Sequence, residues 1–189
     1  ARTLITAHRG VWGGNIPCNT LDAFEVALAQ GADMIELDVA HSADGELFVF
    51  HPGMEKAHLG SERAIADMRA EEVRKLHFHN YDQTLTQARI NTFDEALEAL
   101  KGRCYINVDK FWENIEPVTK AIRRHAMENQ ILVKTGPKED VFRRIAEVAP
   151  DIAYMLILRD RDEYSDRMLS MPLNYVGAEI LFASEDAPI

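Results

Sequence analysis

The sequence contains little cysteine, fewer basic than acidic residues and no long apolar run. Two cysteines in 189 residues are too few for a disulfide framework. Lys and Arg total 21 against 31 Asp and Glu, which gives a formal net charge of -10. This balance argues against a nucleic-acid partner, because phosphate contacts need a basic surface, and against docking on anionic lipid headgroups.

No apolar stretch approaches the ~20 residues of a membrane span, so we expect no stable membrane insertion. A secretory signal is also missing. However, the chain begins at Ala1, almost directly on a predicted strand, and removal of a leader would leave the same start. The sequence therefore predicts a soluble protein, either cytoplasmic or exported after leader removal, and leaves compartment and oligomeric state open.

The composition is that of a globular domain, with 47% apolar and 28% charged residues. We therefore expect residues 1–189 to form one domain. Apolar runs predict strands at residues 4–7, 33–39, 46–51, 105–109, 131–133, 153–158 and 175–182. Helical patterns lie at 21–30, 93–101, 114–127, 137–148 and 161–170, with capping residues Thr20 and Thr92.

This alternation predicts an α/β fold of the TIM (β/α)8-barrel type. Such a barrel needs eight strands and usually about 250 residues. Because only seven strands are predicted, we expect the C-terminal strand to be missing from this chain. The connector at residues 41–45 is too short for a crossover helix. It allows either an extended return or a hairpin around Asp44-Gly45, and both routes bring Asp38 and His51 to the same end.

Residues 53–91 break the alternation, because they are polar, mixed and carry only one short helical stretch, near Glu71–Leu76. A run of about 40 residues without strong periodicity is usually functional when it interrupts a compact domain. We interpret this segment as a small insertion after the third strand, lying over the rim of the barrel.

Three short fragments each close a predicted strand: His8-Arg9-Gly10, Glu36-Leu37-Asp38 and Phe50-His51. The carboxyl ends of parallel barrel strands form the rim where such barrels carry chemistry. Imidazoles, carboxylates and a guanidinium that converge on one rim favour metal-assisted phosphate chemistry.

Glu36 and Asp38 stand two apart on one strand, so their side chains face the same way, and Asp109 ends a later strand. Inward carboxylates at the mouth of a barrel need neutralisation. An all-oxygen set favours one divalent cation, Mg²⁺ or Ca²⁺. Two alternatives stay open: rim acids in salt bridges, with Asp109 paired to Lys110, and a zinc site that recruits the histidines.

His8 and His51 suit general acid–base catalysis, because an imidazole titrates near neutral pH. Arg9 could fork onto phosphate oxygens. Lys134 follows the strand 131–133 and could supply a second positive charge to phosphate or form a rim salt bridge.

Several other residues allow two interpretations. Asn19 could cap a helix or bind substrate, and Glu179 alternates inward on the last predicted strand. Trp12 and Trp112 could wall a pocket or simply pack. The alternating run His77-Phe78-His79 could be a functional edge or a solvated loop.

Taken in order, these fragments resemble the glycerophosphodiester phosphodiesterase family. The resemblance covers about residues 4–110. It rests on His8-Arg9-Gly10, Asn19-Thr20 with Ala23-Phe24, Gly31-Ala32-Asp33, Glu36-Leu37-Asp38-Val39, Asp44-Gly45, Phe50-His51, Ile65–Leu76 and Thr92–Leu97. It implies a TIM barrel with a small insertion after the third strand, and metal-dependent hydrolysis of glycerophosphodiesters to an alcohol and glycerol 3-phosphate.

The resemblance also implies residue roles. Glu36, Asp38 and Asp109 would bind the divalent cation. His8 and His51 would be the acid–base pair. Arg9 would hold phosphate, and the glycerol 2-hydroxyl would attack phosphorus first, giving a cyclic phosphate that water then opens.

The chain departs from the family's pattern at four positions. Cys18 and Pro52 replace a usual Glu and a usual Asp, Asp109 replaces the commoner Glu, and Phe111 replaces a usual Lys. We expect Lys134 to supply the charge that Phe111 lacks.

Two other functions stay open at this point. One is a phospholipase D-like enzyme acting on lipid headgroups, which the acidic balance disfavours. The other is a non-catalytic barrel that binds phosphodiesters, which the replacements at Cys18 and Phe111 favour.

Overall fold

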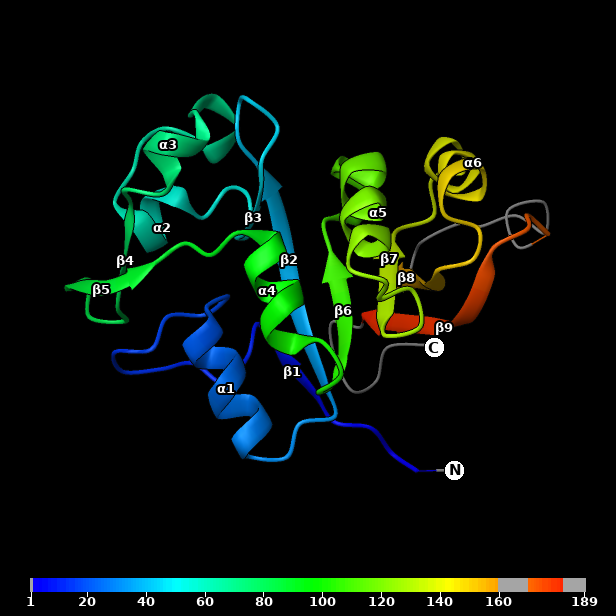
Figure 1. Ribbon diagram of the computed structural model, residues 1–189, viewed down its shortest axis with the longest axis horizontal. Coiled ribbons are helices and arrows are strands. Elements are labelled where there is room, and N and C mark those ends of the chain that lie inside the picture. Colours follow the sequence, from blue (N-terminus) through cyan, green and yellow to red (C-terminus); the bar gives the residue numbers. More distant parts are fainter. Residues whose placement is uncertain (1, 160–169, 182–189) are drawn as a thin grey trace.

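A computed structural model describes residues 2–159 and 170–181 of the chain. Seven strands form its main sheet, in the order β1-β2-β6-β7-β8-β9, with β3 paired to β2 (Figure 1). Their bounds are β1 Thr6–His8, β2 Met34–His41, β3 Leu47–Val49, β6 Tyr105–Asp109, β7 Ile131–Thr135, β8 Ala153–Arg159 and β9 Asn174–Leu181. These strands lie where the apolar runs predicted them.

All neighbouring strands of this sheet are parallel except β2 and β3. The short connector after His41 makes a hairpin that sets Val39 opposite Val49. The structure therefore selects the hairpin over the extended return. It also corrects the predicted end of β2 at Val39, because that strand continues to His41 in order to pair with β3.

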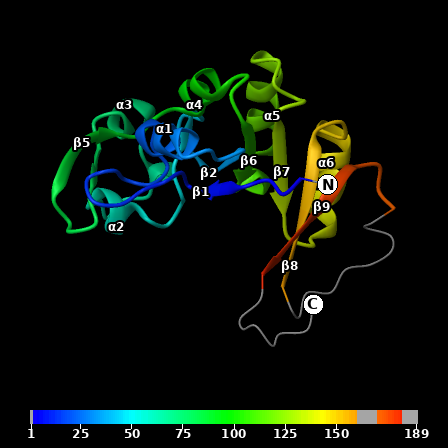
Figure 2. The ribbon, with the colours of Figure 1, turned by 90° about the horizontal axis from the view of Figure 1, so that it is seen from below.

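The main helices connect the parallel strands, and the sheet curls as it passes from β1 to β9 (Figure 2). They are α1 Leu21–Ala29, α4 Phe93–Leu100, α5 Ile115–Arg124 and α6 Glu139–Val148. The predicted caps are present: the Thr20 hydroxyl accepts the Ala23 N–H, and Thr92 and Glu95 form a capping box. The helix predicted at 161–170 falls mainly on residues outside the described part of the chain.

Alternation along the strands separates the core from the site. Ile35, Leu37, Ile106, Val108 and Val133 are fully buried and pack with apolar residues of the helices. Side chains of neighbouring strand residues point to opposite faces. The residues between them therefore share the other face of the sheet: Glu36, Asp38, Asn107, Asp109 and Lys134.

Residues 53–91 hold more regular structure than the sequence indicated. They form α2 (Glu55–Leu59), a 3-10 turn (Ile65–Asp67), α3 (Ala70–Val73) and the antiparallel pair β4 (His77–His79) and β5 (Leu85–Arg89). A second apolar cluster joins this segment to β3 through Phe48, Phe50 and Phe78, among others. The prediction of a single short helical stretch was thus wrong, and the division into one domain with an insertion stays a prediction.

None of the helices in the described part of the chain has the length and apolar character of a membrane span.

Candidate active site

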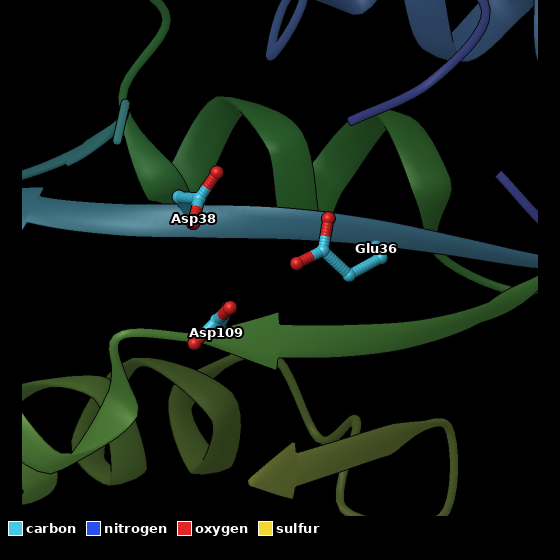
Figure 3. A group of neighbouring side chains, drawn as sticks. All are labelled: Glu36, Asp38 and Asp109. Atoms are coloured by element: carbon cyan, nitrogen blue, oxygen red, sulfur yellow. The ribbon is translucent and has the colours of Figure 1, made fainter. Parts of the chain in front are cut away.

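Three carboxylates from two neighbouring strands gather on the face of the sheet that the helices leave free (Figure 3). β2 carries Glu36 and Asp38, and β6 carries Asp109, which stands opposite Asp38 in the parallel register. One oxygen from each of the three lies within 4.8 Å of the others. Glu36 and Asp38 are 3% and 0% exposed, so water cannot screen their charges.

The donor chemistry of this cluster fits a divalent cation. Hard cations take carboxylate oxygens at roughly 2.0–2.6 Å, so one ion can reach oxygens at this spacing. Glu36 Oε1 and Asp38 Oδ1 are buried and accept no hydrogen bond from the described residues. A buried acceptor without a partner carries the full desolvation cost. Together with one oxygen of Asp109, these two oxygens form a group that could hold a cation.

Crowding of the carboxylates changes the ionisation of Glu36. Burial, with the nearby Asp38 charge acting in the same direction, raises the pKa of Glu36 to about 7. Lys134 opposes this shift. Glu36 thus holds a proton easily in the cation-free protein and must release it when it becomes a ligand.

Lys134 lies inside the cluster rather than on the rim. Its side chain is 4% exposed, and Nζ lies 3.5 Å from Glu36 Oε1 and 3.4 Å from Asp109 Oδ2. It donates a 2.8 Å hydrogen bond to Glu179 Oε2. Burial alone would lower the pKa of Lys134, but the Asp109 charge and the Glu179 hydrogen bond raise it above the ordinary value. Lys134 therefore stays charged, and Glu179 is drawn inward as the sequence predicted.

Arg9 and Asn19 hold Asp38 from the loop after β1. Arg9 Nε lies 3.0 Å from Asp38 Oδ2, and Asn19 Nδ2 donates to the same oxygen at 2.8 Å. Both residues adopt left-handed backbone conformations, with φ of 59° and 57°. L residues rarely adopt this backbone conformation, and it strains the chain locally. The same conformation turns both side chains onto one carboxylate.

The two histidines flank the carboxylates. His8 Nε2 lies 3.9 Å from Glu36 Oε2, and His51 Nε2 lies 3.9 Å from Asp38 Oδ1. His51 Nδ1 lies 2.8 Å from the Pro52 carbonyl oxygen. A carbonyl can only accept, so Nδ1 carries the proton and Nε2 of a neutral His51 faces the cluster with its lone pair. Partial desolvation lowers the pKa of His8, and the Arg9 charge acts in the same direction.

A family model described as the glycerophosphoryl diester phosphodiesterase family matches residues 8–186. The chain belongs to the glycerophosphoryl diester phosphodiesterase family. The match runs through all the fragments that carried the resemblance and extends well beyond residue 110.

Curated proteins that resemble the chain are named glycerophosphodiester phosphodiesterases. A glycerophosphodiester phosphodiesterase of Caldanaerobacter subterraneus subsp. tengcongensis is 29% identical over 164 residues, which are 82% of this chain and 67% of that protein. One from Bacillus altitudinis is 32% identical over 142 residues, which are 70% and 58% of the two chains. The chain thus spans about 60 to 70% of the length of these two relatives.

Solved structures of the family share the fold. A glycerophosphodiester phosphodiesterase from Agrobacterium tumefaciens has a TM-score of 0.71 at 28% identity, covering 83% of this chain and 66% of its own. A phosphodiesterase from Oleispira antarctica, solved with the product sn-glycerol-3-phosphate, has a TM-score of 0.77 at 21% identity, covering 94% and 74%. This likeness confirms the α/β-barrel type of fold, of which the described residues form a curled part.

The chain's departures from the family's pattern have visible structural consequences. Phe111, at the position of the family's lysine, is fully buried in the main core and cannot face the carboxylates. Lys110 turns away, because its Nζ lies 5.0 Å from the centre of the Trp112 ring. Within the described residues the ion-pair partner of Asp109 is Lys134, so the predicted alternative of an Asp109–Lys110 pair is wrong.

The structure defines the positions of two asparagines, Asn19 and Asn107, more closely than the sequence did. Asn19 does not cap α1, because Thr20 does so. The Asn19 side chain instead donates to the Asp38 carboxylate and accepts the Asp38 backbone N–H, so it is not free for substrate. Asn107 was not singled out, yet it is buried beside Asp109, and its Oδ1 accepts no hydrogen bond from the described residues. Its position two residues before Asp109 on β6 was the available signal.

Proposed function

We propose that this chain hydrolyses glycerophosphodiesters to an alcohol and glycerol 3-phosphate, with the help of one divalent cation, Mg²⁺ or Ca²⁺. One observation carries the proposal: three carboxylates, two imidazoles and two cationic side chains converge on one face of the sheet. Metal-assisted phosphoryl chemistry needs each of these group types.

Glu36, Asp38 and Asp109 would hold the cation. When bound, it would neutralise charge that develops on the phosphoryl oxygens and lower the pKa of an attacking hydroxyl. Membership of the family supports this assignment, as do the buried Glu36 and Asp38 oxygens that accept no hydrogen bond from the described residues.

The histidines would move the protons. The Pro52 carbonyl leaves Nε2 of His51 as the free base, so His51 is placed to accept the proton of the attacking hydroxyl. His8, beside Glu36, would give a proton to the departing alkoxide. The P–O bond to the alcohol would break as the glycerol 2-hydroxyl forms a new P–O bond. Water would then open the resulting cyclic phosphate to glycerol 3-phosphate, with the proton roles of the two histidines reversed. Each such proton transfer typically contributes ~10²–10⁴-fold.

Two cations would hold the phosphate. The Arg9 guanidinium has donors left beyond its contact with Asp38, and its planar fork suits phosphate oxygens. Lys134 would add a second positive charge from β7, in place of the lysine that Phe111 displaces. The names of the relatives support a diester substrate, and the Oleispira antarctica protein was solved with sn-glycerol-3-phosphate.

The direct test is glycerol 3-phosphate release from a panel of glycerophosphodiesters in Mg²⁺, Ca²⁺ or chelator. His8→Ala and His51→Ala should each reduce the rate by ~10²–10⁴-fold. His125→Ala is a matched control, because His125 pairs with Asp94 and Glu98 outside the carboxylate cluster. We expect turnover to vanish with chelator and to survive in the control.

Other outcomes would point to other functions. Diester binding without turnover, in a folded chain that binds the cation, would favour the non-catalytic barrel. Cleavage of intact lipid in preference to water-soluble diesters would favour the phospholipase D-like enzyme.

A further inference from the structure

A fourth carboxylate lies close to the three that could hold a cation. Glu36, Asp38 and Asp109 form that group of three (Figure 3). Glu179 comes from β9, which β7 and β8 separate from β6. Lys134 on β7 contacts both Asp109 and Glu179 and so connects the fourth carboxylate to the group. The di-metal centres of ferritin-like bundles also use four carboxylates, together with two histidines. The acidic groups on this face are therefore sufficient for two cations.

The Lys134 ammonium is surrounded as a bound cation would be. An ammonium has three N–H donors, and one oxygen from each of three carboxylates lies within 3.5 Å of Nζ. These are Glu36 Oε1 at 3.5 Å, Asp109 Oδ2 at 3.4 Å and Glu179 Oε2 at 2.8 Å. The Lys134 side chain is 4% exposed, so little water reaches it. A compact positive charge thus stands where carboxylates from three strands converge.

Two of these carboxylates, Glu36 and Asp109, also belong to the group that could hold the divalent cation. Glu36 Oε1 is buried and accepts no hydrogen bond from the described residues, although Nζ lies 3.5 Å away. This oxygen could therefore contact a metal ion and the ammonium at the same time. In two-metal sites the ions lie ~3.5–4 Å apart. Glu36 and Asp109 are placed to bridge two positive centres, of which Lys134 is one.

The charges of the site fit one divalent cation. When ionised, the four carboxylates carry four negative charges, and Arg9 and Lys134 contribute two positive charges. One divalent cation makes the set neutral. A second ion beside Lys134 would add positive charge without a partner in a site that is nearly closed to water, which is costly. Without Lys134, one ion would leave a net negative charge, which attracts a second cation.

We propose that Lys134 occupies the position of a second divalent cation and thereby restricts this four-carboxylate site to one ion. The inference rests on the proposed function, because it concerns the cation site of that function. An ammonium and a metal ion repel each other, so both cannot share the oxygens of Glu36, Asp109 and Glu179. Lys134 therefore determines how many cations the site takes, and Glu179 is the carboxylate that it withholds from them.

The test counts the Mn²⁺ bound to the 189-residue chain by equilibrium dialysis, because Mn²⁺ favours carboxylate oxygens as Mg²⁺ and Ca²⁺ do. The parent chain should bind one Mn²⁺ and Lys134→Met two. The first ion should bind Lys134→Met at least ~10-fold more tightly, because a nearby positive charge is gone. Lys134→Met/Glu179→Gln lacks the fourth carboxylate and should return to one ion. Lys138→Met is the matched control, because Lys138 is exposed at the start of α6 and should keep one ion.

Electron paramagnetic resonance of the same samples reports the spacing of the ions as well as their presence. Two Mn²⁺ ions that share bridging carboxylates are magnetically coupled. Lys134→Met should therefore give the spectrum of a coupled pair, whereas the parent chain gives that of isolated ions. Lys134→Gln removes the charge in a second way and keeps an amide donor for Glu179. It should also bind two ions, and it provides the test if Lys134→Met does not fold.

The outcomes separate this inference from the proposed function. One Mn²⁺ per chain in the folded Lys134 variants, with the spectrum of isolated ions, would overturn the inference and leave the proposed function standing. Two coupled ions in the parent chain would also overturn it, because Lys134 would then not be limiting. A parent chain that binds no Mn²⁺ and cleaves no diester would overturn the proposed function, and the inference would fall with it.

Discussion

At the scale of single residues, the site is governed by charges that cannot reach water. Glu36 and Asp38 are nearly inaccessible, and Lys134 and Arg9 are the cations closest to them. Buried charges are tolerated only when they are paired or bind a metal. In the cation-free chain these buried charges therefore affect the free energy of unfolding, and this effect can be measured.

Glu36 makes the stability of the cation-free chain depend on pH. Its native pKa of about 7 lies above the 4.5 of an unperturbed Glu. Between these two values the native state binds more protons than the unfolded state, so the free energy of unfolding falls as the pH rises. The shift corresponds to about 3 kcal/mol, lost by pH 8. Urea unfolding in chelator at pH 5 and pH 8 measures it.

Glu36→Gln should abolish this contribution, because an amide does not titrate. Glu62→Gln is the control, since the Glu62 side chain is 78% exposed and should leave the pH dependence unchanged. An unchanged pH dependence in Glu36→Gln would show that this carboxyl group is not the one held protonated.

Lys134 and Glu179 should be strongly coupled. Lys134→Met leaves three carboxylates without their common cation, and breaking a buried pair typically costs about 3–5 kcal/mol. Glu179→Gln removes the hydrogen-bonded partner at 2.8 Å but leaves Glu36 and Asp109 to hold the ammonium, so it should cost less. A double-mutant cycle in urea, with chelator present, measures the coupling, which we expect at about 1–3 kcal/mol. Additive effects would contradict the pairing.

At the scale of elements, the loop after β1 uses left-handed residues to turn side chains inward, and glycine allows α1 to approach. Gly10 has φ of +80°, and a Cβ there would lie 2.7 Å from the backbone carbon of Ala23 in α1. Close packing of α1 against this loop therefore requires glycine.

Gly10→Ala should destabilise the chain well beyond the strain of its backbone angle. Gly45 provides a matched control, because its φ is +85° but no atom lies within 4 Å of its Cβ position. Each alanine bears a left-handed strain of roughly 1–2 kcal/mol. Gly10→Ala adds a clash with helix backbone that typically costs about 1–3 kcal/mol more. Denaturant unfolding of both variants checks this, and equal losses would contradict it.

The sequence predicted those elements whose signals are local. Apolar runs located the seven strands of the main sheet, and Thr20 and the Thr92–Glu95 box located the starts of α1 and α4. Convergence at strand ends also located the carboxylates. The hairpin between β2 and β3 could not be decided, because a five-residue connector is compatible with either direction of the next strand.

What the sequence missed depends on non-local packing. The second apolar cluster brings Phe48, Phe78 and Ile90 together without any regular spacing along the chain. The alternating run His77-Phe78-His79 was too short to predict β4, and no periodicity indicated β5. The bond from Asn19 to Asp38 likewise depends on a left-handed turn that no motif announced. Contacts made across the sheet, rather than along a strand or helix, were the ones that sequence reasoning could not assign.

At the scale of the whole molecule, the curled sheet presents two outer strands. Within the described residues, β1 pairs with β2 alone and β9 with β8 alone. Apolar side chains at these two strands are open to water: Ile5 is 62% exposed, Ile180 is 44% and Leu181 is 41%. A sheet edge with unpaired backbone groups and exposed apolar side chains is a template for pairing with another chain.

We therefore expect the 189-residue chain to associate as its concentration rises, through β1 or β9. Ile5→Lys and Ile180→Lys place a charge on these edges and should each reduce the association, because an edge lysine opposes strand addition. Light scattering coupled to size-exclusion chromatography over a dilution series measures it. Leu85→Lys is the control: Leu85 is 60% exposed but lies on β5, at the opposite end of the molecule from β9 (Figure 1). If the control reduces association as much as the edge variants, the open edges of the main sheet are not the contact.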